Sequence, residues 1–196
     1  MNGETICRSD VIDGWRVLRF YKRLGYGEKC YRRLQHAVFN WNFEALVGDR
    51  AMGIVAAATR EQKVRAQDTD ATRHLLATFT EIRFPRPFKS LFIVNPVHVV
   101  RERRDVKRQV DNCVFSSTSY ATLQGHLLAG EEKVTVIWRN GAGNEVDVEI
   151  VSCSRSAPSL AGKAIWPLIG RMQKQFFLAE MDHFDSIAKA QSSFAL

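Results

Sequence analysis

The clearest pattern in the chain is an alternation of apolar and polar positions on either side of a turn-rich stretch, residues 140–144. The apolar positions, two residues apart within each arm, are Val134, Val136, Trp138, Val146, Val148 and Ile150. Successive side chains of a β-strand point to opposite faces, so a period of two produces one apolar face. The pattern therefore predicts an antiparallel β-hairpin with one buried face.

Apolar, β-branched runs predict further strands earlier in the chain. They are expected at residues 14–23, 76–84, 91–94 and 97–101, with a turn at 24–27 and a bend at Asn95-Pro96. The segments without a clear strand pattern are 1–13, expected to be a weakly structured leader, and 42–60, expected to be a strand or a short buried helix.

Two segments show the helical period of 3.6 residues. The first, residues 28–41, carries an apolar stripe formed by Tyr31, Leu34, Val38 and Trp41. The second, residues 164–190, carries a longer stripe that includes Ile165, Ile169, Met172, Phe176, Phe177, Met181, Phe184 and Ala188. Pro167 is expected in the first turn of this second helix, where no backbone donor is lost.

The order of these elements is a helix, many strands and a long amphipathic helix. It predicts an α+β fold in which helices pack on an antiparallel sheet. A length of 196 residues and an apolar content of 45% fit one domain, 1–196, with a core at about 14–190.

The formal net charge of +7 raises the question of an anionic partner. Five basic and two acidic residues fall within 101–108, which is expected to be a solvated loop or a strand edge. Contact of this run with phosphate groups is the functional alternative. No nucleic-acid-reading module is found, so nucleic acid is not an expected partner.

The four cysteines form no CxxC pair, which argues against a zinc knuckle or a redox motif. The first residues, MNGETICRSD, lack the apolar core of a signal peptide, and no apolar run of about 18 residues predicts a membrane span. A cytoplasmic protein with reduced thiols is expected, with an organelle left open. The oligomeric state is left open too.

The segment 120–133, YATLQGHLLAGEEK, resembles the signature of uncharacterised protein family 0548. Agreeing features are Gly25-x-Gly27 with Tyr31 and Trp41, the stretch Asn95-Pro96-Val97-His98-Val99-Val100, and Ser154 ahead of a helix that contains Gln173. The match runs from about residue 20 to 188 and is weak over 45–90. The resemblance implies a START-like helix-grip fold, in which a curved antiparallel sheet wraps a long C-terminal helix around an apolar cavity.

The signature also supplies the candidate site. His126 could exchange protons near neutral pH, with Glu132 setting its pKa; the structural alternative is that both satisfy loop groups or lie in solvent. The candidate ligand-binding residues are Trp41, Tyr120, Gln124, His126, Trp138 and Phe177. For the aromatic residues, packing in the core is the simpler explanation.

No metal and no cofactor are expected, because the five histidines form no HExxH pair and no phosphate loop or nucleophile elbow occurs. Three hypotheses follow. The leading one is a binder of a hydrophobic or amphipathic small molecule between the sheet and the C-terminal helix. The others are an enzyme on the same scaffold that uses His126 and Glu132, and an interaction protein with a basic surface.

Overall fold

The computed structural model describes residues 4–40, 52–54, 75–82, 91–141, 143–158 and 160–190. Its elements, in chain order, are β1 (Ile6–Ile12), β2 (Trp15–Tyr26), α1 (Gly27–Phe39), β3 (Met52–Ile54), β4 (Leu75–Ile82), β5 (Leu91–Arg108), β6 (Cys113–Thr122), β7 (Leu128–Arg139), β8 (Glu145–Ser156) and α2 (Leu160–Lys189). Strands and helices therefore follow the α+β order that the sequence predicts.

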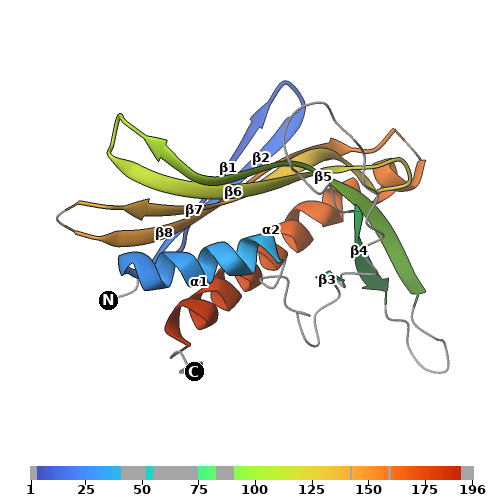
Figure 1. Ribbon diagram of the computed structural model, residues 1–196. Coiled ribbons are helices and arrows are strands. Elements are labelled where there is room, and N and C mark those ends of the chain that lie inside the picture. Colours follow the sequence, from blue (N-terminus) through green and yellow to red (C-terminus); the bar gives the residue numbers. More distant parts are fainter. Residues whose placement is uncertain are drawn as a thin grey trace, which may run out of the picture.

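The strands form one antiparallel sheet, and α2 lies across it. In the described residues the sheet has eight strands in the order β1-β2-β8-β7-β6-β5-β4-β3. Helix α2 contacts β2 and β8 on one side and β3, the last strand of this order, on the other (Figure 1). The sheet thus curves around the C-terminal helix, which confirms the predicted helix-grip architecture.

One face of the sheet, called the inner face here, is packed against the helices. A cross-strand row that pairs Phe20 with Ile150, Ile150 with Val134 and Val134 with Thr118 defines it. All four side chains are buried, and the ring of Phe20 lies 5.4 Å from that of Phe177 on α2. The opposite, outer face carries the alternate residues of the same strands.

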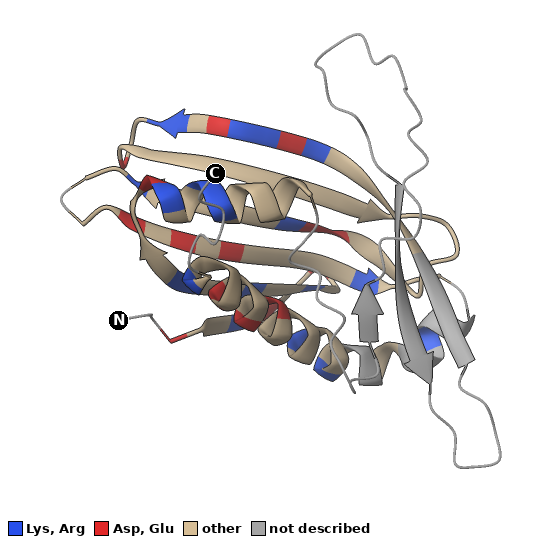
Figure 2. Cartoon of the chain, turned by 60° about the horizontal axis from the view of Figure 1, so that its bottom comes forward, with Lys and Arg blue, Asp and Glu red and all other residues tan. Residues whose placement is uncertain are grey.

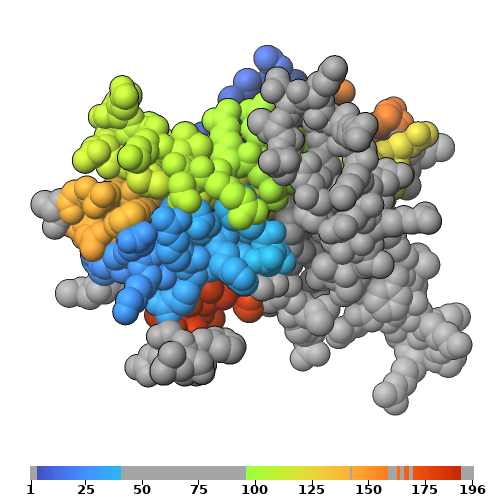
Figure 3. All heavy atoms as spheres, in the orientation of Figure 1, coloured from blue at the N-terminus to red at the C-terminus, as the bar shows by residue number. Residues whose placement is uncertain are grey.

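Helix α1 covers the inner face where β6 begins and β7 ends. It starts at Gly27, whose φ of 82° is a left-handed conformation that glycine adopts without strain. Its fully buried Tyr31 stacks on Trp138 of β7, with ring centroids 5.7 Å apart. In the space-filling view α1 (blue) lies between β5 (green) and the C-terminal end of α2 (red) (Figure 3).

The strongest sequence patterns are confirmed. The predicted hairpin is β7–β8, and its apolar positions Val134, Val136, Val146, Val148 and Ile150 are all buried. Both predicted helices are present, with buried stripes that include Leu34 and Val38 in α1 and Phe176, Met181 and Phe184 in α2. The predicted strand 76–84 is β4.

Two predictions near the N-terminus were wrong. Residues 1–13 were expected to lack regular structure, but β1 pairs along its whole length with β2. The turn expected at 24–27 is instead the end of β2, which continues to Tyr26 through an irregular register between Arg23 and Gly25. The reason is that β8 supplies a partner for this stretch, and local glycine content did not reveal it.

Two further predictions were wrong later in the chain. Asn95-Pro96 does not divide two strands, because β5 runs unbroken over 18 residues. Pro96 lies at the pairing of β5 with β4. The charged run 101–108 continues β5 and, among the described strands, pairs only with β6, which agrees with the strand edge that the sequence offered as one of two interpretations. Helix α2 begins at Leu160, so Pro167 lies inside the helix and not in its first turn.

Gly130 of β7 lies close against the backbone of its antiparallel neighbour β8, with which it pairs at Ser154. A Cβ atom at this position would lie 2.2 Å from the backbone oxygen of Cys153. Gly130→Ala is therefore expected to lower the free energy of unfolding by about 1–3 kcal/mol, because the two strands must separate. Gly141→Ala is the matched control, since a Cβ there meets nothing within 4 Å. Equal urea midpoints for the two variants would contradict this close approach.

Candidate functional site

A buried carboxyl group, that of Glu132, lies on the inner face. Its cross-strand row is the neighbour of the row that contains Phe20, Ile150, Val134 and Thr118. In the row of Glu132, Val99 pairs with Tyr120, Tyr120 with Glu132, Glu132 with Ser152 and Ser152 with Leu18. Glu132 is only 5% exposed. The Tyr120 hydroxyl donates a hydrogen bond of 2.6 Å to its Oε2. The strand register thus places an acid and a phenol between apolar neighbours.

Burial raises the pKa of Glu132 to about 8, and the hydrogen bond from Tyr120 opposes this rise. Glu132 is therefore largely uncharged at pH 7. Because Oε2 accepts from Tyr120, the proton belongs on Oε1, which is buried and has no hydrogen-bond partner among the described residues. An unsatisfied buried polar atom costs about 1–3 kcal/mol, so this oxygen is available for a ligand atom.

Helix α2 contributes further polar groups to the same interior. The Gln173 amide donates to Ser154 Oγ on β8 at 3.3 Å. One turn on, Phe177 packs on Phe20, and the next turn brings Glu180, which is 1% exposed. Buried carboxyl groups are rare unless they have a function or a partner. Two of them, Glu132 and Glu180, distinguish this interior from an ordinary apolar core.

Arg16 adds a cation beside Ser154, with which it pairs across β2 and β8. Its guanidinium lies 4.1 Å from the ring centroid of Trp166, and burial lowers its pKa. Its Nη1 is buried and has no hydrogen-bond partner in the described part of the chain. The end of the inner face under the N-terminal half of α2 therefore carries a buried cation.

His126 and Gln124 lie in the turn between β6 and β7. His126 Nδ1 accepts a hydrogen bond of 2.9 Å from the backbone nitrogen of Leu128. Burial lowers the pKa of His126 to about 4, and Glu132 is not among the groups that shift it. Gln124 is exposed. The structure therefore joins Glu132 to Tyr120, where the sequence suggested a pairing with His126.

The aromatic candidates lie apart from one another. Trp138 is at the far end of β7 from Glu132, where it stacks on Tyr31 and donates from Nε1 to Asn144. Phe177 is buried between Phe20 and Phe176. Trp41 falls outside the described residues. Of the proposed ligand-binding residues, Tyr120 is the one that the structure brings into hydrogen-bond contact with Glu132.

Sequence reasoning missed Arg16, Ser152 and Glu180. Two of these carried a detectable signal. Ser152 interrupts the apolar alternation of β8 after Val148 and Ile150, and Glu180 lies in the apolar stripe of α2 between Phe176 and Phe184. A polar residue at a core position of an otherwise apolar pattern is a reason to suspect a buried functional group.

The described segments contain neither a candidate metal site nor a candidate membrane-spanning helix. No three His, Cys, Asp or Glu side chains there come together in a way that could hold a metal ion. No helix there is long and apolar enough to cross a membrane.

The arrangement can do two things chemically. An uncharged carboxyl group donates a hydrogen bond from Oε1, so it can hold the hydroxyl or carbonyl group of a ligand. A pKa of about 8 also lets Glu132 give or take a proton near neutral pH, with Tyr120 attached to it. Both activities depend on a group that reaches Glu132 through the interior.

Comparison with solved structures gives distant similarities. The lipid transfer and protein localization domain of human StarD13 (DLC2) has 5% identity and a TM-score of 0.48, over 96% of this chain and 91% of that one. Human STARD10 has 9% identity and a TM-score of 0.29, over 90% and 73%. A point mutant of Thalictrum norcoclaurine synthase in complex with a transition-state analogue has 8% identity and a TM-score of 0.42, over 94% of this chain and 96% of that one. These values are too low to transfer a ligand or an activity.

No curated protein matches the chain. A family match, in contrast, covers most of it, from residue 3 to residue 182, and includes the row of Tyr120 and Glu132, the residues of α1 and most of α2. The family is described as a domain of unknown function, DUF1990, and the match confirms the resemblance to an uncharacterised family that the segment 120–133 suggested. The chain belongs to the DUF1990 family.

Proposed function

We propose that this protein binds an amphipathic small molecule between the inner face of its sheet and helix α2, with the polar group of the ligand at Glu132. The observation that carries the proposal is the uncharged, buried Glu132, whose Oε1 has no hydrogen-bond partner in the described part of the chain. A ligand hydroxyl or carbonyl oxygen at this position would satisfy it.

The surroundings of Glu132 support an amphipathic ligand over a fully polar one. Val99 and Leu18 occupy the same cross-strand row, and Phe177 of α2 packs two residues away from Leu18, on Phe20. Small-molecule sites are typically apolar with a few well-placed polar groups. The apolar part of the ligand would contact these side chains, and its uncharged polar group would meet Glu132.

Native mass spectrometry of the purified protein, followed by denaturing extraction, tests the proposal. We expect an adduct at pH 7 that dissociates on raising the pH to 9, because ionisation of Glu132 removes the Oε1 donor. Glu132→Gln cannot ionise and is expected to keep the adduct at both pH values. Glu132→Leu is expected to lose it at both.

The matched control is Glu131→Gln, which removes a carboxyl group from the neighbouring residue on the outer face. It is expected to behave as the unmodified protein does. A clean apo mass at pH 7, or release at pH 9 that is the same in Glu132→Gln, would contradict the proposal.

An enzyme on this scaffold is the second candidate, and it rests on the pKa of about 8 at Glu132. Catalytic acids and bases work best when their pKa is near the working pH. Here Glu132, with Tyr120 attached, would transfer the proton, and the role suggested for His126 is replaced. The extracted ligand separates the two functions: binding leaves it chemically unchanged over hours, whereas catalysis converts it, and Glu132→Gln stops the conversion.

A further inference from the structure

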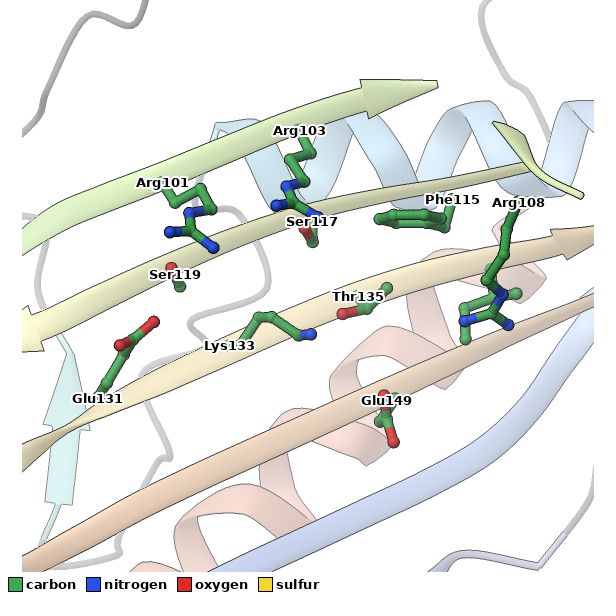
Figure 4. A pocket seen from close by; sticks show the side chains of 11 residues that line it. Arg101, Arg103, Arg108, Phe115, Ser117, Ser119, Glu131, Lys133, Thr135 and Glu149 are labelled. Atoms are coloured by element: carbon green, nitrogen blue, oxygen red, sulfur yellow. The ribbon is translucent and has the colours of Figure 1, made fainter. Parts of the chain in front are cut away.

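The outer face of the sheet holds a pocket that the interior site does not use. It has a volume of about 270 Å³ and opens over β5, β6, β7 and β8 (Figure 4). This space is several times the volume of a water molecule, which suits a compact polar group such as a phosphate. We call it the outer-face pocket.

Two neighbouring cross-strand rows build the pocket. In one, Arg101 of β5 pairs with Ser119 of β6, and Ser119 with Lys133 of β7. In the other, Arg103 pairs with Ser117, Ser117 with Thr135, and Thr135 with Glu149 of β8. Residues that are directly opposite each other have Cβ atoms about 5 Å apart, so Arg101 borders the hydroxyl group of Ser119 and Arg103 borders that of Ser117.

The floor of the pocket consists of hydroxyl groups. Ser117, Ser119 and Thr135 are each at most 5% exposed. Thr135 Oγ1 is buried and has no hydrogen-bond partner among the described residues. A hydroxyl group can donate to an anionic oxygen, and such hydrogen bonds are stronger than neutral ones. The floor therefore provides at least one donor, the Thr135 hydroxyl group, that the described part of the protein does not itself use.

The walls of the pocket are basic. Arg101, Arg103 and Lys133 are exposed, and none of them forms an ion pair with another described residue. Figure 2 shows the Lys and Arg residues that follow the second half of β5, and Figure 4 shows the Arg101 and Arg103 side chains directed over β6 toward Ser119 and Ser117. Arg101 and Arg103 lie on β5 and Lys133 lies on β7, on either side of the serines of β6. Like charges around one pocket repel one another, so an anion between them would relieve this repulsion.

The other charged side chains that line the pocket are Arg108, Glu149 and Glu131, and the first two have partners of opposite charge. Arg108 is held by Asp111 through two hydrogen bonds of 2.8 and 2.6 Å. Glu149 lies 3.7 Å from Arg19. Glu131 lines the pocket and is exposed, so it reduces the positive potential at that end. The excess positive charge is thus concentrated at Arg101, Arg103 and Lys133.

We propose that the outer-face pocket binds a phosphate-type anion, with Arg101, Arg103 and Lys133 around the anion and the hydroxyl groups of Ser117, Ser119 and Thr135 beneath it. The anion is either a soluble phosphate compound or the headgroup of an anionic lipid, since both present the same oxygens. Arginine forms paired hydrogen bonds with such oxygens, and lysine adds a point charge.

Isothermal titration with inorganic pyrophosphate and flotation with vesicles test the site together. The vesicles contain phosphatidylcholine alone or with about one-fifth phosphatidic acid, an amount chosen to give a strong negative surface potential. Arg101→Ala and Lys133→Ala are each expected to weaken binding at least 10-fold. Glu131→Gln is expected to strengthen it about 2- to 3-fold. Binding should also fall in 0.5 M NaCl, where exposed charges are screened.

Lys174→Ala is the matched control, because it removes the same charge from an exposed position on α2. It is expected to bind like the unmodified protein. Pyrophosphate binding that depends on Arg101 and Lys133 assigns a soluble ligand, and vesicle binding alone with that dependence assigns a lipid headgroup. No binding of either probe, or an equal loss in Lys174→Ala, overturns the proposal. Glu132→Leu separates this site from the interior one, since it is expected to leave anion binding unchanged.

Discussion

Replacing Tyr31 by alanine is expected to lower the free energy of unfolding by about 3–5 kcal/mol, the usual effect of removing a fully buried aromatic side chain. Tyr31 is 0% exposed and stacks on Trp138. Its hydroxyl also donates to Asp105 at 2.9 Å and lies 2.8 Å from Ser116 Oγ. The alanine variant would lose the stacking contact of α1 with β7. Urea unfolding followed by circular dichroism measures the effect.

Tyr31→Phe separates packing from hydrogen bonding. It keeps the ring and removes only the hydroxyl group, so a loss of about 1 kcal/mol is expected. Ser116 Oγ would remain satisfied, because it also accepts from Gln35 at 2.7 Å and from the Asp105 backbone nitrogen at 2.9 Å. If Tyr31→Phe were as unstable as Tyr31→Ala, the hydrogen bonds and not the stacked ring would hold α1 in place.

The stability of the protein is expected to fall by about 2 kcal/mol between pH 6.5 and pH 8, at about 1.4 kcal/mol per pH unit. Burial raises the pKa of Glu132 to about 8, so the folded protein keeps a proton that the unfolded chain releases near pH 4.5. The stability that this proton provides is complete below the unfolded pKa. It is lost as the pH rises through the folded pKa.

His126 acts in the opposite direction at lower pH. Its pKa is lowered by burial from 6.5 to about 4, so the folded state excludes a proton that the unfolded chain binds. Stability is therefore lost as the pH falls from 6.5 toward 4, over the range in which Glu132 adds stability. The two slopes cancel there. A flat profile between about pH 4.5 and pH 6.5, with a decline above pH 6.5, is the expected result.

The variant Glu132→Gln separates the contributions of Glu132 and His126 to the pH dependence of stability. The glutamine cannot titrate, so the decline between pH 6.5 and pH 8 should disappear. The stability of this variant should then fall with acid below pH 6.5, because His126 is no longer opposed. Chemical unfolding at half-unit pH intervals gives both slopes. A decline above pH 6.5 that persists in Glu132→Gln would assign it to a group other than Glu132.

Local patterns were sufficient for the elements whose partners are close in sequence or whose stripe is long. The β7–β8 hairpin needs only an alternating pattern and a short loop. Helix α2 needs only a period of 3.6 residues sustained over many turns. The wrong predictions concern segments whose secondary structure depends on pairing with another strand. Residues 6–12 form β1 because β2 pairs with them, and β2 continues to Tyr26 because β8 lies beside it.

The candidate site, too, was predicted only in part from the sequence. The segment 120–133 identified Tyr120 and Glu132 as residues of interest, but it connected Glu132 to His126, six residues away. In the structure β6 and β7 are antiparallel and Tyr120 is directly opposite Glu132, so the two side chains share one face. His126, in the connecting turn, contacts the backbone of Leu128. Spacing along a chain cannot reveal a pairing that depends on strand register.

By itself the sequence determined the family, the α+β class, the two helices and the hairpin, because each follows from a repeated local pattern or a long specific segment. Only the tertiary structure decided that Glu132 is uncharged, since its pKa depends on burial on the inner face and on the hydrogen bond from Tyr120. It also decided that Arg101, Arg103 and Lys133 surround a floor of hydroxyl groups. The register of four strands sets which of their residues share a face, and that register is a property of long-range pairing.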